Sequence, residues 1–182
     1  MMHEGSRSTH ETARVKVVSS EAMPEDARLA TARWVHEMFG SDEDRFVWAK
    51  VRHHVLVYVG NQLASHLAIV ERNATAGGEP VQLAGIGGVM TPPEWRGKRL
   101  ASAAMHKAEA FMRDKLRAEF GLLLCSEELM TFYERLGWQR VAHPVYFHQP
   151  SGRIQWNERA MVLPCTARAW PEGEVDLCGL PW

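Results

Sequence analysis

The sequence predicts an α/β domain in which helices flank a central sheet of mixed antiparallel and parallel strands. Stretches with strand-like and helix-like patterns alternate along most of the chain. An apolar strand that ends at Thr91, Pro92 and Pro93 is followed, after one turn, by a long amphipathic helix. The run 122–125 is apolar without interruption, which is typical of a strand buried on both faces. With 182 residues, of which 46% are apolar, the chain is long enough to bury a core.

The first half of the chain is expected to form an antiparallel meander. Residues 1–13 are rich in polar residues and read as a disordered leader, so we expect a single domain over 14–182. A helix opens at Pro24 and ends before Gly40. The Gly60-Asn61 pair predicts a hairpin turn, and a second turn is expected at 76–80. The four strands before the central helix are 14–19, 55–59, 63–70 and the strand that ends at Thr91.

The second half is expected to alternate helices with strands. The central helix carries an apolar stripe from Leu100 to Leu116. The strand 122–125 follows, and then a helix that ends at Gly137. Two further strands are expected at 141–148 and 154–163, and residues 164–182 are predicted to be a tail without regular structure.

Composition excludes several classes of function. The formal net charge is −1, which lacks the basic balance of a nucleic-acid-binding domain. No run of about 20 apolar residues is present, so neither a membrane span nor a secretory signal is expected, and we expect the chain in the cytoplasm. Cys125, Cys165 and Cys178 are odd in number and lack metal-type spacing, which favours reduced thiols. The histidines are scattered, and no metal site is expected.

A basic turn between the fourth strand and the central helix predicts an anion-binding site. The prolines before it cannot extend the strand, so the first amides of the helix, over residues 97–101, are expected to be unpaired and to point outward. Arg96, Lys98 and Arg99 add positive charge to this terminus. A basic helix start is also typical of a solvated surface turn, so the turn alone does not decide the function.

This turn resembles the pyrophosphate-binding loop of the GNAT N-acetyltransferases, which has Arg or Gln, two residues, Gly, one residue, then Gly or Ala. Arg96 and Ala101 fit the pattern, whereas Arg99 occupies the position usually given to the first glycine. The resemblance implies the GNAT acyl-CoA N-acyltransferase fold and acetyl-CoA as cosubstrate. The residues that it implies for cofactor binding are Val89, Met90, Arg96, Gly97, Lys98, Arg99, Leu100, Ala101 and Tyr133.

A second motif, from Phe132 to Trp138, resembles the Tyr-x-x-x-Gly-Phe/Trp signature of the same family. The resemblance implies that Tyr133 is catalytic and returns a proton to the departing CoA thiolate. Tyrosine suits this role because its ordinary pKa of about 10 keeps it protonated at neutral pH. The alternative is a tyrosine that only packs in the core. Cys125 is a second candidate, as a covalent acetyl carrier, but it has no visible His partner, which favours a buried structural thiol.

A closer resemblance, to the aminoglycoside 2'-N-acetyltransferases, covers nearly the whole chain. It includes Phe39-Gly40 with the acidic cluster that follows, Glu94-Trp95-Arg96 and the terminal Trp182. This resemblance implies that the amine acceptor is an aminoglycoside, and that its acetylation gives resistance to that antibiotic. Because such acceptors are polycationic, carboxylates are expected on the walls of the acceptor site. The implied acceptor residues are Asp42, Glu43, Asp44, Ser126, Glu127, Glu158, Asp176 and Trp182.

One position departs from this closer family and leaves the catalytic base open. The 2'-N-acetyltransferases carry a glutamate on the central strand, and Gly87 stands at the equivalent position here. The base is then His66, Glu127, His148, the terminal carboxylate or bulk solvent. The missing glutamate also hints at a different acceptor, of which kasugamycin, a smaller and less cationic aminoglycoside, is the specific hypothesis.

Other functions remain open at this point. One alternative is a peptide, protein or other small-amine N-acetyltransferase, which would need an open groove instead of an acid-lined pocket. Another is a non-catalytic acyl-CoA-binding domain. Trp182 could also simply pack on the sheet. The expected partner is a small-molecule amine, with neither nucleic acid nor membrane, and a homodimer is possible.

Overall fold

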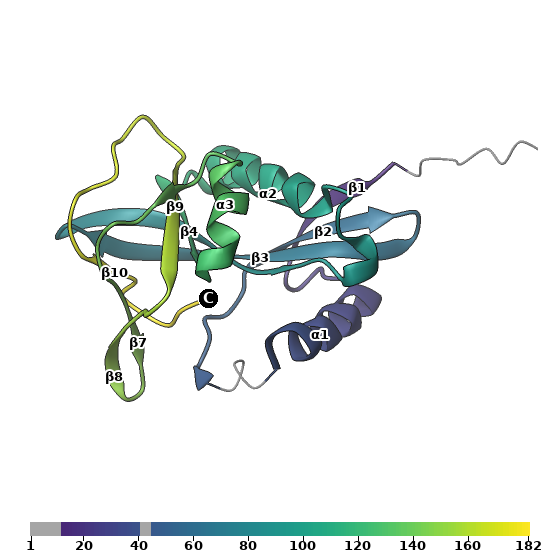
Figure 1. The fold of residues 1–182 in the computed structure, drawn as a ribbon, viewed down its shortest axis with the longest axis horizontal. Helices are drawn as coiled ribbons and strands as arrows, with labels where there is room; N and C mark the ends of the chain where they lie inside the picture. The colour runs from purple at the N-terminus through teal and green to yellow at the C-terminus, as the bar shows by residue number, and fades with distance from the viewer. Residues whose placement is uncertain (1–11, 41–44) are drawn as a thin grey trace, which may run out of the picture.

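The computed structural model describes residues 12–40 and 45–182, and Asp42, Glu43 and Asp44 therefore lie outside the described residues. Within this part of the chain ten strands form one mixed sheet, and helices lie on both of its faces (Figure 1). Along the sheet the strands run in the order β6-β9-β5-β4-β3-β10-β7-β8, and β2 and β1 continue from β3. The predicted fold class is confirmed.

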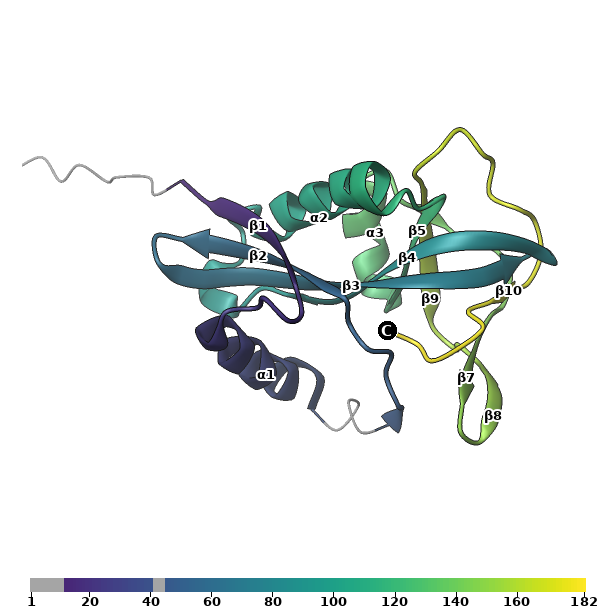
Figure 2. The same cartoon turned by 180° about the vertical axis from the view of Figure 1, so that it is seen from behind.

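The antiparallel meander β1–β4 is present as predicted. Its strands are long and pair in sequence order, with β3 and β4 forming a hairpin that spans the sheet (Figure 2). The helix α1, Glu25–Phe39, ends at Gly40 as expected, and Gly40 has a positive φ of 54°. The four strands are β1 Arg14–Ser19, β2 His53–Val59, β3 Gln62–Ala76 and β4 Glu79–Met90.

The central helix and the strand after it form the crossover that places the site. A 3₁₀ turn, η2 Pro93–Trp95, leads from β4 into α2, Leu100–Phe111, which continues as a π-helical turn, η3 Met112–Leu116. After this crossover β5, Phe120–Cys125, returns parallel to β4. The predicted helix from Leu100 to Leu116 is therefore present, although its last turn is not α-helical.

The C-terminal part differs from the sequence prediction in three places. The strand predicted at 141–148 begins only at Val145, the strand predicted at 154–163 is divided between β8 and β9, and the tail contains a short strand. Pro144 interrupts the first stretch because proline has no amide hydrogen for a ladder. The elements are η4 Glu127–Leu129, α3 Met130–Glu134, β6 Gln139–Arg140, β7 Val145–Gln149, β8 Gly152–Gln155, β9 Arg159–Pro164 and β10 Val175–Asp176.

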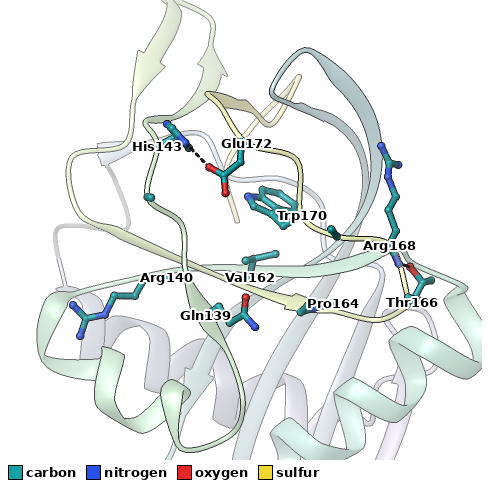
Figure 3. A pocket seen from close by; sticks show the side chains of 12 residues that line it. Gln139, Arg140, His143, Val162, Pro164, Thr166, Arg168, Trp170 and Glu172 are labelled. Carbon is teal, nitrogen blue, oxygen red and sulfur yellow. Dashed lines mark hydrogen bonds and ion pairs between the residues drawn. The ribbon is translucent and has the colours of Figure 1, made fainter.

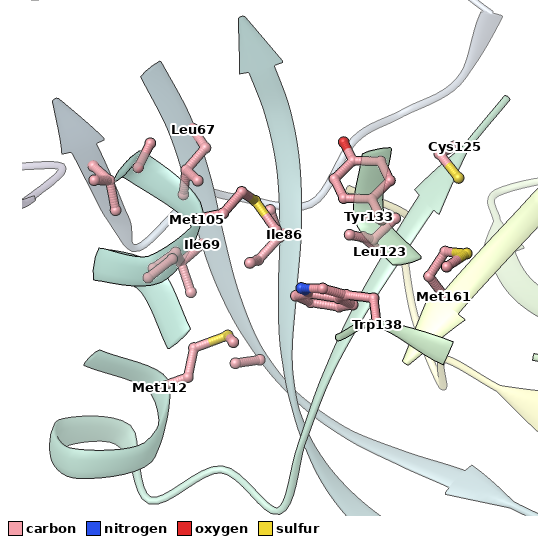
Figure 4. Packing of buried hydrophobic residues seen from close by; sticks show 14 of the residues in the cluster. Leu67, Ile69, Ile86, Met105, Met112, Leu123, Cys125, Tyr133, Trp138 and Met161 are labelled. Carbon is pink, nitrogen blue, oxygen red and sulfur yellow. The ribbon is translucent and has the colours of Figure 1, made fainter. Parts of the chain in front are cut away.

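Two large apolar clusters cover the two faces of the sheet, and a smaller third one, which includes Ala27 and Leu56, lies beneath α1. The first lies between the sheet and the helices α2 and α3, and it contains Ile86, Met105 and Tyr133 (Figure 4). The second lies on the opposite face, beneath the C-terminal tail, and it contains Leu83, Phe147 and Trp182. No helix of the described residues is long and apolar enough to cross a membrane.

Candidate active site

The candidate site lies where β4 and β5 separate. The two strands pair in parallel from Leu83 opposite Phe120 to Ile86 opposite Leu123. Beyond Ile86, β4 runs on to Met90 while β5 continues to pair only with β9. The backbone of residues 87–90 therefore has an edge that no neighbouring strand covers, and it is open to hydrogen bonding with a ligand.

Side chains of β3 hold the open end of β4. The hydroxyl of Ser65 donates to the carbonyl of Met90 at 3.1 Å, and Nδ1 of His66 donates to the carbonyl of Gly88 at 3.0 Å. Gly88 has a φ of 53°, and the pairing register shifts here. Val89 follows this irregularity, on the part of β4 that lies beyond its pairing with β5. Val89 thus occupies a position from which its amide can bind a thioester carbonyl.

His66 is held too tightly to act as a base. It is 4% exposed, and its Nε2 lies 2.9 Å from Nδ1 of His54, so both ring nitrogens have partners. Burial, and then the neighbouring His54, lower the pKa of His66 to about 4. A neutral ring with Nδ1–H is the tautomer that the Gly88 carbonyl requires, and we assign it on that basis.

The basic turn that the sequence predicts to bind an anion, a cradle over residues 96–99, lies between η2 and α2. Residues 96–99 are all exposed, whereas Leu100 is buried and anchors the start of α2. The side chain of Arg96 turns back and donates to the carbonyl of Thr91 at 3.0 Å, and Nζ of Lys98 lies 4.4 Å from the centre of the Trp95 ring. Among the described residues, the amides of residues 97–99 have no hydrogen-bond acceptor. They remain available to an anion such as a pyrophosphate.

Arg99 shows how the cradle keeps its shape without the usual glycine. It adopts the left-handed conformation, with φ 59° and ψ 21°, at the position where the family pattern has glycine. A left-handed residue with a side chain costs about 1 to 2 kcal/mol, which explains why glycine is common there. Gly97 has a φ of 74°, and a Cβ added to it would meet nothing within 4 Å. The turn is thus open on the side from which a ligand approaches.

Tyr133 lies beside the gap, on the face covered by α2 and α3. Figure 4 shows its ring between β4 and β5, with the hydroxyl directed toward β4. The residue is 4% exposed, and its hydroxyl has no hydrogen-bond partner among the described residues. Burial raises the pKa of Tyr133 well above its ordinary value, and nearby Cys125 adds to the shift. The phenol therefore stays protonated and can donate a hydrogen bond into the gap.

The Cys125 thiol is buried at the end of β5 and behaves as a structural group. Burial, followed by the nearby Glu158, raises the pKa of Cys125 to about 11. A thiol with this pKa carries almost no thiolate at neutral pH and is a poor nucleophile. The structure therefore favours the interpretation of Cys125 as a packed thiol over that of a covalent acetyl carrier.

The C-terminal tryptophan occupies the other face of β4 at the same place. A Cβ added to Gly85 would lie 2.1 Å from Cε2 of Trp182, so the indole lies flat against a strand that must carry glycine. A Cβ added to Gly87 would lie 2.9 Å from the carboxyl carbon of Trp182 and 3.3 Å from its oxygen. The main-chain carbon and oxygen of Trp182 therefore stand where the first atoms of a side chain at position 87 would be.

Tyr133 and the main chain of Trp182 thus flank the gap from opposite faces of the sheet. Ile86 and Tyr133 belong to the cluster under α2 and α3, whereas Trp182 belongs to the cluster on the opposite face. Tyr133 contributes a protonated phenol, and Trp182 contributes a main-chain oxygen. A reaction in which one proton is taken up on one side and another delivered on the other side can use this arrangement.

The remaining acceptor residues predicted from the sequence are only partly brought together. Ser126, Glu127 and Glu158 lie near the end of β5, close to the gap, where Glu127 accepts from Nη2 of Arg159 at 2.9 Å. Asp176 lies elsewhere, because it pairs with Thr75, and Thr75 pairs with Pro80 near the start of β4.

Asp176 is also already neutralised. It accepts hydrogen bonds from Arg153 at 2.7 Å, from His148 at 3.0 Å and from the amide of Cys178 at 2.7 Å. These bonds outweigh burial and lower the pKa of Asp176. His148, a base candidate from the sequence, is held by the same carboxylate. Asp176 and His148 therefore stabilise the tail. Neither of them lies beside the gap, where Trp182 lies.

A surface hollow of about 440 Å³ lies at another edge of the sheet (Figure 3). It is bounded by β6, β9 and the loop that follows β9, and it includes Val162, Pro164 and Trp170. Its charged groups are paired with protein groups, as His143 with Glu172 at 2.9 Å. It contains none of the residues of the gap and is not part of the candidate site.

Comparison with known proteins agrees with this geometry. The model of the acetyltransferase (GNAT) domain family matches residues 14–141, which is most of the chain. The chain belongs to the GNAT acetyltransferases. It is therefore an enzyme that transfers an acetyl group from acetyl-CoA to an amine, and the open turn at 96–99 and the gap beyond Ile86 fit that cosubstrate.

Individual relatives are distant. The chain is 25% identical to an aminoglycoside 2'-N-acetyltransferase of Mycolicibacterium fortuitum over 154 residues, which are 82% of this chain and 78% of that protein. The solved structure of the GNAT family N-acetyltransferase YhbS of Escherichia coli, in complex with CoA, superposes with a TM-score of 0.60 at 17% identity, over 93% of this chain and 94% of the other. A probable N-acyltransferase of Enterococcus faecalis gives 0.56 at 23% identity, over 71% of this chain but only 33% of that chain.

Proposed function

We propose that this GNAT acetyltransferase acetylates an amine of an aminoglycoside, with the carboxylate of Trp182 as the base. The observation that carries the proposal is the position of that carboxyl group, 2.9 Å from where a side chain at Gly87 would begin. The resemblance to the 2'-N-acetyltransferases places their glutamate at Gly87. The main chain of Trp182 reaches the same place from a different part of the sequence.

The reaction follows from the groups on the two faces. The amine enters from the Trp182 side, its nitrogen attacks the thioester carbon, and its proton passes to the carboxylate directly or through water. The negative charge on the carbonyl oxygen is stabilised by backbone amides at Val89. The carbon–sulfur bond then breaks, and Tyr133 donates a proton to the CoA sulfur. The products are the N-acetylated acceptor and CoA.

Tyr133 is well suited to the last step. Its raised pKa exceeds the ordinary pKa of a thiol, about 8.5, so the proton leaves the phenol only as charge develops on sulfur. The acetyl-CoA side needs the cradle at 96–99 for the pyrophosphate, with Val89 and Met90 along the β4 edge. Binding both substrates in the gap supplies the proximity that the attack requires.

The charges near the site favour an acceptor with few ammonium groups. Glu127 is paired with Arg159, and Asp176 with Arg153 and His148, so neither is free for a ligand cation. Among the described residues, Glu128 and Glu158 have no hydrogen bond or ion pair, and both lie near the end of β5. This supports a less cationic aminoglycoside, such as kasugamycin, as the specific acceptor.

The experiment is an acetyl-transfer assay over an acceptor panel. Thiol release from acetyl-CoA is measured with kasugamycin, with polycationic aminoglycosides, with simple primary amines and with peptides that carry a free N-terminus. We expect the highest kcat/KM for kasugamycin, and NMR of the product identifies the acetylated nitrogen. Preferred acetylation of peptides would replace the proposal with the peptide-acetyltransferase alternative.

A further inference from the structure

Arg72, on β3, is a half-buried cation that touches the C-terminal tail. Its Nη2 donates to the carbonyl of Leu180 at 3.1 Å, and its guanidinium carbon lies 5.9 Å from the centre of the Trp182 ring. No salt bridge involves Arg72 among the described residues, whereas Arg168, which is also partly buried, is paired with two carboxylates. A half-buried charge without a carboxylate partner is costly, so its contacts with the tail are the ones that hold it.

The tail is shaped to receive this guanidinium. A Cβ added to Gly179 would lie 1.7 Å from Nη1 of Arg72 and 3.0 Å from its central carbon. A larger residue at this position would displace the guanidinium from the place it occupies here. Arg72 therefore contacts three consecutive parts of the tail, which are the bare Gly179 backbone, the Leu180 carbonyl and the Trp182 ring.

Two backbone bonds complete the docking. The amide of His148 donates to the carbonyl of Gly179 at 2.8 Å, and the amide of Ala49 donates to the carbonyl of Pro181 at 2.7 Å. Any residue type could make these two bonds. Arg72 is the side chain in the described part of the chain that donates a hydrogen bond to the last four residues.

We propose that Arg72 is a positioning residue for catalysis, which orders the C-terminal tail so that the carboxyl group of Trp182 lies at Gly87 before the acceptor binds. The proposal rests on the proposed role of the terminal carboxylate. The new element of the proposal is that the Arg72 guanidinium, on a strand two positions away from β5, determines where the Trp182 carboxylate lies. A flexible chain end would hold this position only a fraction of the time, and the fraction would reduce kcat directly.

The first measurement follows the docking of the tail without using activity. Hydrogen–deuterium exchange is compared at the amides of Ala49 and His148, which are protected by the tail, in the wild type and in Arg72→Met. Methionine keeps an unbranched apolar stem but removes the donor and the charge. We expect both amides to exchange at least about tenfold faster, because a hydrogen bond to a charged group contributes about 1.5 to 3 kcal/mol. The matched control is Arg168→Met, since Arg168 is also partly buried but bonds Glu79 and Glu119.

The second measurement separates positioning from general stability. In Arg72→Met, kcat for acetyl transfer should fall about tenfold or more, while the KM for acetyl-CoA stays within about twofold. Arg72→Lys should recover part of the loss, because it restores a donor but not the planar group over the ring. Arg168→Met should lower stability without this kinetic pattern. Gly179→Ala should reproduce the effect of Arg72→Met, because its methyl group displaces the guanidinium.

The exchange and kinetic results for Arg72→Met together decide the proposal. Faster exchange together with lower kcat supports the proposal, and either change without the other overturns it. Deletion of residues 179–182 tests the proposed function separately. If the deletion abolishes acetyl transfer while Arg72→Met changes nothing, only the role of Arg72 is wrong. If the deletion leaves kcat at the wild-type value, the role of the terminal carboxylate is wrong as well.

Discussion

Gly85→Ala is a single methyl group placed where the structure has no room for it. The new Cβ would lie 2.1, 2.4 and 2.5 Å from Cε2, Cδ2 and Cζ2 of Trp182. Carbon atoms in contact are normally about 3.5 to 4.0 Å apart, so the indole would have to retreat by more than about 1 Å. All three atoms belong to one rigid ring, and no rotation of a side-chain tip relieves the overlap. The terminal residue must therefore leave its site.

The expected losses follow from what the ring and the carboxylate contribute. Trp182 is 9% exposed, and removal of a buried tryptophan costs about 3 to 5 kcal/mol, so the free energy of unfolding should fall by up to that amount. General-base catalysis contributes about 10²- to 10⁴-fold, so kcat for acetyl transfer should fall at least about a hundredfold. The cradle at 96–99 is untouched, and the KM for acetyl-CoA should stay the same.

The assay is a double-mutant cycle with Trp182→Ala. Urea unfolding and steady-state kinetics are measured for the wild type, both single variants and the double variant. Once Trp182 is truncated, the alanine at position 85 has space, and adding it should change neither stability nor kcat further. Wild-type kcat and stability in Gly85→Ala, or fully additive losses in the double variant, would refute the packing of the indole on β4.

Three further predictions concern the cradle, the acid and the buried histidines. Arg96→Glu and Gly97→Asp should raise the KM for acetyl-CoA, because both place a carboxylate where a pyrophosphate binds. Lys98→Ala should change this KM little, since an exposed charge contributes about 0 to 1 kcal/mol. An unchanged KM in the first two variants would show that the turn does not bind the pyrophosphate. Tyr133→Phe should lower kcat about 10²- to 10⁴-fold with acetyl-CoA binding intact, and a loss below about threefold would leave the tyrosine a packing role. Because burial lowers the pKa of His66 from 6.5 to about 4, the folded state keeps this ring neutral, so its contribution to stability is complete above about pH 6.5 and is lost as the pH falls toward 4. The loss amounts to about 3 kcal/mol of the free energy of unfolding. Urea unfolding at several pH values should show that this free energy declines less steeply with falling pH in His66→Gln, which can still donate to Gly88. An equal pH dependence in the two proteins would contradict the neutral buried ring.

The sequence was sufficient for the parts of the site that are local in the chain. The cradle depends on prolines, a glycine and basic residues within about ten positions, and each acts through backbone rules that hold in any fold. The turns at Gly40 and Gly60 were found for the same reason. Arg99 was the exception, since it adopts the left-handed conformation that the pattern reserves for glycine.

The parts that sequence reasoning missed depend on contacts between distant segments. No local sequence pattern predicts that Gly85 packs against Trp182 or that Gly179 packs against Arg72, because each glycine is explained by a residue about a hundred positions away. The tail strand β10 is only two residues long and is held by β3 and β7, so it has no periodicity to detect. The resemblance to the 2'-N-acetyltransferases placed Asp176 in the acceptor site, whereas the structure shows that its partners are Arg153 and His148.

The central claim is that the carboxylate at the chain end accepts the proton of the amine. The most direct measurement is the pH dependence of kcat/KM for the preferred acceptor in the wild type and in a semisynthetic protein whose Trp182 ends in a carboxamide. The amide keeps the size and packing of the residue but cannot accept a proton at neutral pH. We expect kcat/KM to fall at least about a hundredfold in the amidated protein, with the KM for acetyl-CoA unchanged. Equal kcat/KM and the same pH profile in both proteins would contradict the account.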